Sequence, residues 1–125
     1  MQFDGIHSEQ RGLRPGVVFQ NNVGNLHSPN TIALPITSSI KNKNLPTHVF
    51  LKATETGLHM DSVVLCESPE RMAKEKLSRY IATLSKDYMK RITEASLLAT
   101  SAISFLDEVT LLRIWQTAVA LNTAQ

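Results

Sequence analysis

The sequence is poor in cysteine, in aromatic residues and in net charge. Cys66 is the only cysteine of the 125 residues. It excludes an intramolecular disulfide and a CxxC redox pair, and it fits a reducing, cytoplasmic compartment. The aromatic content of 6% is low for a module that binds proline-rich peptides in an aromatic groove. A net charge of +2 permits an anionic partner without the strong basic bias of many nucleic-acid binders.

Long hydrophobic runs and metal-ligand patterns are also missing. The most apolar stretch, 96–121, is interrupted by Asp107, Glu108 and Arg113, so we expect no membrane span. The first residues lack the basic and apolar regions of a signal peptide. Histidines stand in loops or strands with no second ligand at metal spacing, and we expect neither a metal site nor a cofactor.

The first half of the chain has the composition of short strands separated by turns. Apolar and β-branched runs occupy 16–20, 31–37, 47–52 and 61–67, with Asn, Gly, Pro or Lys between them. Pro35 predicts an edge position or a bulge for its strand. Strands at this spacing, with no helices between them, predict a small barrel or sandwich.

The pattern changes after Glu67. A Ser-Pro start and helix-forming residues predict a short helix over 68–77, followed by a last strand over 78–84. Ser85 predicts the N-cap of a longer helix with one apolar face. The tail, 107–125, is a second helical candidate whose apolar residues are spread around the helix, and it either caps the core or serves an interface. No linker divides the chain, so we expect one domain over 1–125.

Four runs in this order carry a family resemblance: SEQRGLRPGVVFQNNVGN, LPITSSI, LPTHVFL and DSVVLCE. They resemble the MazF/PemK toxins of bacterial toxin–antitoxin pairs, most closely the branch found in Gram-positive bacteria. The resemblance covers about 5–106 and leaves the tail, 107–125, outside it.

The resemblance implies a mainly β fold, a small SH3-like β-barrel with short helices and a C-terminal helix. It further implies a homodimer that an antitoxin peptide inhibits by occupying the RNA groove. The implied activity is sequence-specific, metal-independent cleavage of single-stranded RNA through the substrate 2′-hydroxyl.

Two catalytic residues follow from the resemblance, Arg14 of the R-P motif and Thr37 at the end of the next strand. A guanidinium offers a rigid set of donors for phosphoryl oxygens but is a poor general base. The Thr37 hydroxyl would position the phosphate. In the preceding loop, His7, Ser8, Glu9 and Gln10 offer donors and acceptors for RNA. Lys41 and Lys43 either attract phosphates or solubilise the rim of the barrel.

The sequence departs from the family at its start. The usual first strand is absent, and its loss would expose a sheet edge. This favours an alternative, a catalytically inactive relative that retains dimer and antitoxin binding, whereas Arg14 and Thr37 favour the enzyme. His7 replaces the usual glycine and is a hypothetical general base, since histidine titrates near neutral pH.

Overall fold

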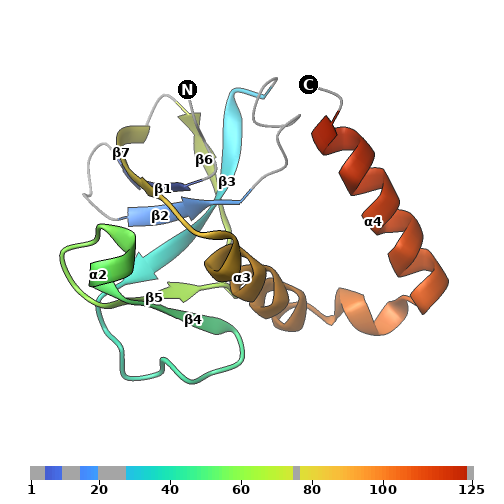
Figure 1. Ribbon diagram of the computed structural model, residues 1–125, viewed down its shortest axis with the longest axis horizontal. Coiled ribbons are helices and arrows are strands. Elements are labelled where there is room, and N and C mark those ends of the chain that lie inside the picture. The colour runs from blue at the N-terminus through green and yellow to red at the C-terminus, as the bar shows by residue number, and fades with distance from the viewer. Residues whose placement is uncertain (1–4, 10–14, 20–27, 75–76, 124–125) are drawn as a thin grey trace.

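The computed structural model describes residues 5–9, 15–19, 28–74 and 77–123. Its strands are β1 (Gly5–Glu9), β2 (Pro15–Val18), β3 (Asn30–Thr37), β4 (His48–Leu51), β5 (Ser62–Leu65), β6 (Glu70–Ala73) and β7 (Leu77–Thr83). Its helices are α2 (Ala53–Thr56), α3 (Lys86–Ala99), the 3₁₀ helix η2 (Ser101–Phe105) and α4 (Glu108–Thr123). All five strands expected from the sequence are present. Figure 1 shows α3 beside the sheet and α4 beyond it.

The strands form one antiparallel sheet in the order β4-β5-β3-β2-β1-β7, and β6 also pairs with β3. The prediction of a mainly β fold is confirmed. Within the described residues the two ends of this path, β4 and β7, are not paired with each other. The sheet is therefore open, and the expected closed barrel is corrected to this extent.

Strand β3 is central because it changes partner on one side along its length. Its first residues, 30–33, pair with β6, and its last two, Ile36 and Thr37, pair with β5. The opposite side pairs with β2, where the Ile32 carbonyl accepts a bond from the Phe19 amide at 2.7 Å. Backbone groups alternate between sides along a strand, so Pro35 directs its nitrogen toward the side where the partner changes. The edge position predicted for Pro35 is therefore wrong. Its missing amide hydrogen lies between the residues of β3 that pair with β6 and those that pair with β5.

The first strand includes residues 7–9, which the sequence predicted to be in a loop. Residues 5–9 form β1, which pairs with β2 on one side and with β7 on the other. Its register with β7 shifts twice, between Ile6 and His7 and between Ser8 and Glu9. We expected the missing family strand to leave a sheet edge exposed. The edge of β2 is not exposed in this way, because β1 pairs with it.

One expected helix is a strand instead. The segment predicted as helical, 68–77, contains β6, whose residues pair with the first half of β3. Hydrogen bonding to an existing strand outweighs the helix propensity of these residues. A short helix, α2, lies in a predicted loop, and Gly57 ends it with a φ of 77°, a conformation that glycine adopts without a steric penalty.

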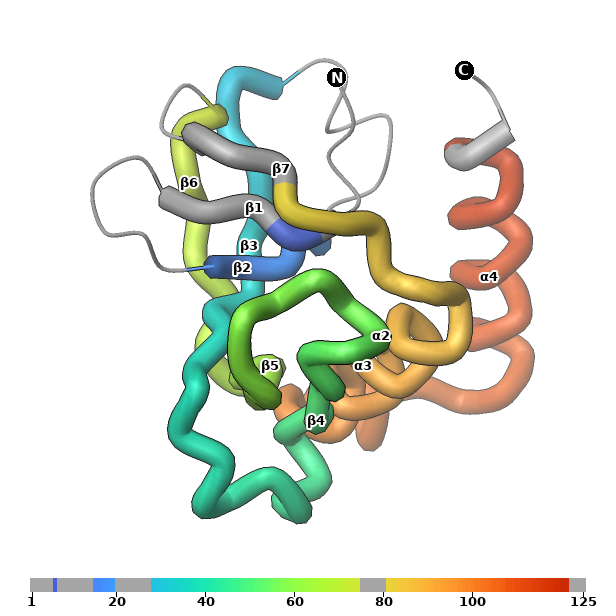
Figure 2. Tube along the Cα trace, turned by 60° about the vertical axis from the view of Figure 1, so that its left-hand side comes forward, coloured from blue at the N-terminus to red at the C-terminus, as the bar shows by residue number. Residues whose placement is uncertain are grey.

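The core lies between the sheet and α3, as Figure 2 shows from a second side. Its members with the lowest exposure include Ile6, Val17, Leu34, Leu51, Val64 and Ile92. Helix α3 begins where the sequence predicted, because the Ser85 hydroxyl accepts a bond from the Tyr88 amide at 3.2 Å. Three residues of α3, Tyr88, Ile92 and Ala95, face the core at helical spacing.

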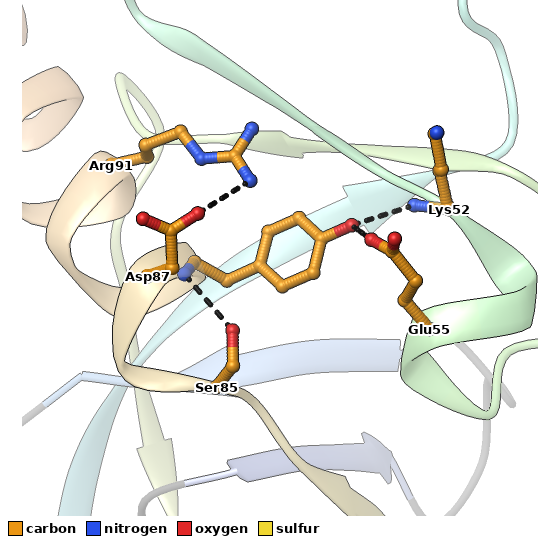
Figure 3. Close-up of polar contacts among 6 residues, drawn as sticks. Lys52, Glu55, Ser85, Asp87 and Arg91 are labelled. Carbon is orange, nitrogen blue, oxygen red and sulfur yellow. Dashed lines mark hydrogen bonds and ion pairs between the residues drawn. The ribbon is translucent and has the colours of Figure 1, made fainter.

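Tyr88 joins α3 to α2, and Figure 3 shows the contacts at this junction. Its hydroxyl donates to the Glu55 carboxylate and accepts a bond from the Lys52 amide at 3.4 Å. Burial, and then the bond to Glu55, raise the pKa of Tyr88 above its usual value. Arg91 lies over the Tyr88 ring and forms an ion pair with Asp87. These contacts fix the start of α3 against the turn that follows β4.

The tail forms the helix expected there. The Asp107 carboxylate accepts a bond from the Thr110 amide at 2.7 Å, which caps α4 and lowers the pKa of Asp107. Within the described residues, neither α4 nor any other helix has the length and apolarity needed to cross a membrane.

Cys66 provides a test of the core. Its side chain is buried, and burial raises the pKa of the thiol from 9.0 to about 11. Because the thiolate is the reactive form, we expect a thiol reagent at pH 8 to label the folded protein at least ~100-fold more slowly than the urea-unfolded chain. Above pH 9 the unfolded thiol ionises first, so the free energy of unfolding should fall as the pH rises toward 11. Equal labelling rates would show that Cys66 is accessible.

Candidate active site at the end of strand β3

Thr37 is the last residue of β3 and is half-buried. Its hydroxyl oxygen accepts a bond from the Ser39 amide at 3.1 Å, so the side chain forms a turn with its own backbone. In the part of the chain that the structure describes, no acceptor binds the hydroxyl proton of Thr37. The hydroxyl can therefore donate to a ligand. The Thr-Ser-Ser run signals this turn, which the sequence analysis missed.

The register brings the end of β3 beside the start of β2. Gly16 pairs with Pro35, so Pro15 and Thr37 lie at the same end of this antiparallel pair. The backbones approach closely there, since a Cβ on Gly16 would lie 3.3 Å from the Leu34 carbonyl oxygen. Across β2, Pro15 pairs with Ser8 of β1. The end of β1, the start of β2 and the end of β3 thus share one end of the sheet.

The predicted site residues lie differently in the structure. Gln10 and Arg14 lie outside the described residues, whereas Thr37 is at the strand end predicted for it. Residues 7–9 (His7, Ser8 and Glu9) were predicted in a loop, and this is wrong for their backbone, which belongs to β1. The pairing of β1 with two neighbours accounts for the difference.

Lys41 and Lys43 follow Thr37 on an exposed segment, 38–46. Its turns are held by backbone bonds from Lys43 to Ile40 and from Leu45 to Asn42, at 3.3 and 3.2 Å. The Lys43 ammonium lies 5.0 Å from the centre of the Phe50 ring, within the range of a cation–π contact. Both lysines therefore present positive charge on the segment that leaves the site.

His48 fixes the far end of this segment. Its Nδ1 lies 2.8 Å from the Asn42 carbonyl oxygen, and its Nε2 lies 2.7 Å from Glu67 Oε2. A carbonyl oxygen only accepts, so Nδ1 donates to Asn42. Both ring nitrogens of His48 are therefore hydrogen-bonded within the chain. The sequence carried no signal for its partner Glu67, which lies 19 residues along the chain.

The described residues contain no cluster of side chains that could bind a metal ion. Among residues 5–9, 15–19, 28–74 and 77–123, no three His, Cys, Asp or Glu side chains gather closely enough to hold a metal ion. What the described geometry offers is a hydroxyl donor, two ammonium groups and the backbone of three strand ends. This set suits recognition of an anion such as a phosphate.

Comparison with known proteins identifies the family of this chain. Residues 1–98 match the family of PemK-like, MazF-like toxins of type II toxin–antitoxin systems. The chain belongs to this family. It is 38% identical over 100 residues to endoribonuclease EndoA of Bacillus subtilis, a match that covers 80% of this chain and 86% of the relative.

Solved structures of toxins share the fold. The Mycobacterium tuberculosis toxin MazF-mt6 superposes with a TM-score of 0.68 at 29% identity, over 76% of this chain and 94% of that one. A MazE–MazF structure from Deinococcus radiodurans gives a TM-score of 0.64 at 18% identity, over 86% and 98%. The second likeness supports the fold alone. The comparisons thus support the mainly β, MazF-like fold of this toxin, whose sheet is open within the described residues.

The His48 contacts can be tested by mutation. In the His48→Ala variant, Asn42 and Glu67 lose their ring partner, so we expect a loss of about 1–3 kcal/mol in the free energy of unfolding. Amide hydrogens of 41–47 should also exchange faster. His59→Ala removes an exposed histidine and should change stability by less than about 0.5 kcal/mol. Equal unfolding curves for His48→Ala and wild type would contradict the role given to His48.

Proposed function

We propose that this toxin is an endoribonuclease that cuts single-stranded RNA at specific sequences without a metal ion. The supporting relative is named an endoribonuclease and shares 38% of its residues over the matched length. The structural observation that carries the proposal is Thr37, a hydroxyl donor at the sheet end where β2 begins. It lies next to the segment that carries Lys41 and Lys43.

Arg14 is the second catalytic residue of the proposal. It directly precedes Pro15 in the sequence. Pro15 in turn lies at the same end of the sheet as Thr37. A guanidinium at this position would bind the phosphoryl oxygens with paired donors, while Thr37 donates its hydroxyl proton to the same phosphate.

The reaction uses the substrate as its own nucleophile. The 2′-hydroxyl oxygen attacks the adjacent phosphorus and loses its proton to a base, for which His7 is the candidate. The P–O5′ bond breaks, and the leaving 5′-oxygen takes a proton. In this proposal the Arg14 guanidinium donates it. The products are a 2′,3′-cyclic phosphate and a 5′-hydroxyl. The protein contributes position and positive charge, the two effects that dominate phosphoryl transfer.

Substrate recognition is assigned to residues around this centre. Ser8, Glu9 and Gln10 are proposed to contact bases or backbone of the unpaired strand. Lys41 and Lys43 are exposed and are proposed to neutralise phosphates on either side of the cut.

The partners of the proposal are a second toxin chain and an antitoxin peptide. Solved relatives include a mycobacterial endoribonuclease in complex with its cognate antitoxin and MazE–MazF structures from Deinococcus radiodurans. RNA as substrate and the single buried cysteine both fit action in the cytoplasm. An inactive relative was considered because a missing strand would expose a sheet edge. This alternative is disfavoured, because β1 pairs with both β2 and β7.

The test is cleavage of a long RNA of mixed sequence in EDTA, resolved on a gel. Wild type should give discrete bands. Thr37→Val, which keeps the shape and removes the hydroxyl, and Arg14→Ala should each cleave at least ~100-fold more slowly. Thr93→Val removes an exposed hydroxyl from α3 and is the matched control, expected to cleave at the wild-type rate.

Circular dichroism establishes that each variant is folded. A folded wild type that does not cut, a requirement for added Mg²⁺, or a Thr37→Val variant with the wild-type rate would contradict the proposal.

The base assigned to His7 has its own test in the pH dependence of the rate. If His7 accepts the 2′-hydroxyl proton, protonating it stops the reaction, and the rate falls toward acid pH. His7→Gln should lower the rate and flatten this acid limb. An acid limb of unchanged shape in His7→Gln would remove His7 from the mechanism.

A further inference from the structure

Helix α4 lies outside the region that defines the family. The family match ends at residue 98, whereas α4 spans Glu108–Thr123 and is reached through η2. Figure 1 and Figure 2 both show α4 standing apart from the sheet. From Leu112 to Leu121 every side chain is exposed. The helix therefore adds nothing to the core of its own chain over this length.

Most apolar residues of α4 lie on one half of the helix. At 3.6 residues per turn, this half carries Leu111, Leu112, Ile114, Trp115, Ala118, Val119 and Leu121, with Glu108 at its start, whereas Val109 and Ala120 lie on the opposite half. The other half carries most of the polar residues, among them Thr110, Arg113, Gln116 and Thr117. The Thr117 hydroxyl donates to the Arg113 carbonyl at 2.9 Å, as is usual on a solvated helix face. The expected spread of apolar residues around this helix holds for Val109 and Ala120, whereas the larger apolar side chains after residue 110 share one half.

The exposed apolar area is as large as one side of a stable interface. Trp115 is 63% exposed and Phe105, just before α4, is 82% exposed. With Leu112, Ile114, Val119 and Leu121, at 41–55% exposure, these side chains present an apolar area on the order of 600 Å². Each partner in a specific complex buries about 600–1,000 Å². An apolar patch of this size on an isolated chain indicates an interaction site.

Charge decides between the possible occupants. Glu108 and Arg113 are the only charged residues of α4, one of each sign. RNA and anionic lipid surfaces are bound by helices with a basic face, and a single arginine does not supply one. From residue 111 to residue 121 the apolar half carries no charge, since Glu108 lies at its start and Arg113 on the other half. This stretch is complementary to an identical stretch, and a two-fold axis brings the same surface of two copies together. We infer that α4 is a self-association surface, whose apolar half packs against α4 of a second copy of this chain.

Trp115 makes the inference directly measurable, because it is the only tryptophan in the sequence. Its emission reports α4 alone, and sedimentation of the same samples reports mass. On dilution, wild type should show a red shift of the emission over the concentration range in which its mass falls. Neither measurement uses RNA, so failure of the cleavage assay leaves this test unaffected.

Two variants form a matched pair. Val119→Lys places a charge on the apolar half and should raise the dissociation constant at least tenfold, with red-shifted emission at all concentrations. Thr117→Lys places the same charge on the polar half and should associate like wild type, within twofold. Both positions are exposed in the single chain, so the core is unaffected.

Two results would overturn the inference. Trp115 emission that is independent of concentration would mean that α4 is either solvated or packed on its own chain. Equal dissociation constants for Val119→Lys and wild type would mean that the chain self-associates without α4.

Discussion

The change of partner along β3 is the constraint on which the rest of the structure depends. One edge of β3 pairs with β2 over residues 32–35, while its other edge pairs first with β6 and then with β5. Pro35, which has no amide hydrogen, occupies the change. The strand can therefore continue to Thr37 and deliver that residue to the sheet end where β2 begins. The proposed active site is a consequence of this register.

The region around Thr37 is organised by short polar contacts rather than by a cluster of acids and bases. Ser39 holds the Thr37 side chain, and His48 connects the loop carbonyl of Asn42 to the Glu67 carboxylate. Such contacts suit a reaction in which the substrate supplies the nucleophile. The protein then needs to hold a phosphate and to stabilise its charge, which a hydroxyl, a guanidinium and nearby lysines can do.

The sequence predicted the parts of this structure that local chemistry decides. Ser85 caps α3 because its hydroxyl accepts a bond from the Tyr88 amide, and Thr37 ends a largely apolar run over 31–37, so both were visible in advance. The segments at 7–9 and 70–73 were missed because their strand form depends on partners far along the chain. The pairing of His48 with Glu67 was missed for the same reason. The apolar half of α4 was present in the sequence but became evident only from the exposure of residues 112–121 in the described structure.

The central claim is that the substrate's own 2′-hydroxyl is the nucleophile and that the protein positions the phosphate. Once the cut sequence is known, the most direct measurement compares an all-ribose oligonucleotide with one that carries a single 2′-deoxynucleotide on the 5′ side of the scissile phosphate. Our account predicts that cleavage at this phosphate is abolished in EDTA, while an unmodified second site in the same strand is cut at its usual rate. Cleavage at the deoxynucleotide at a similar rate would contradict the account, because the nucleophile would then be water or a protein group.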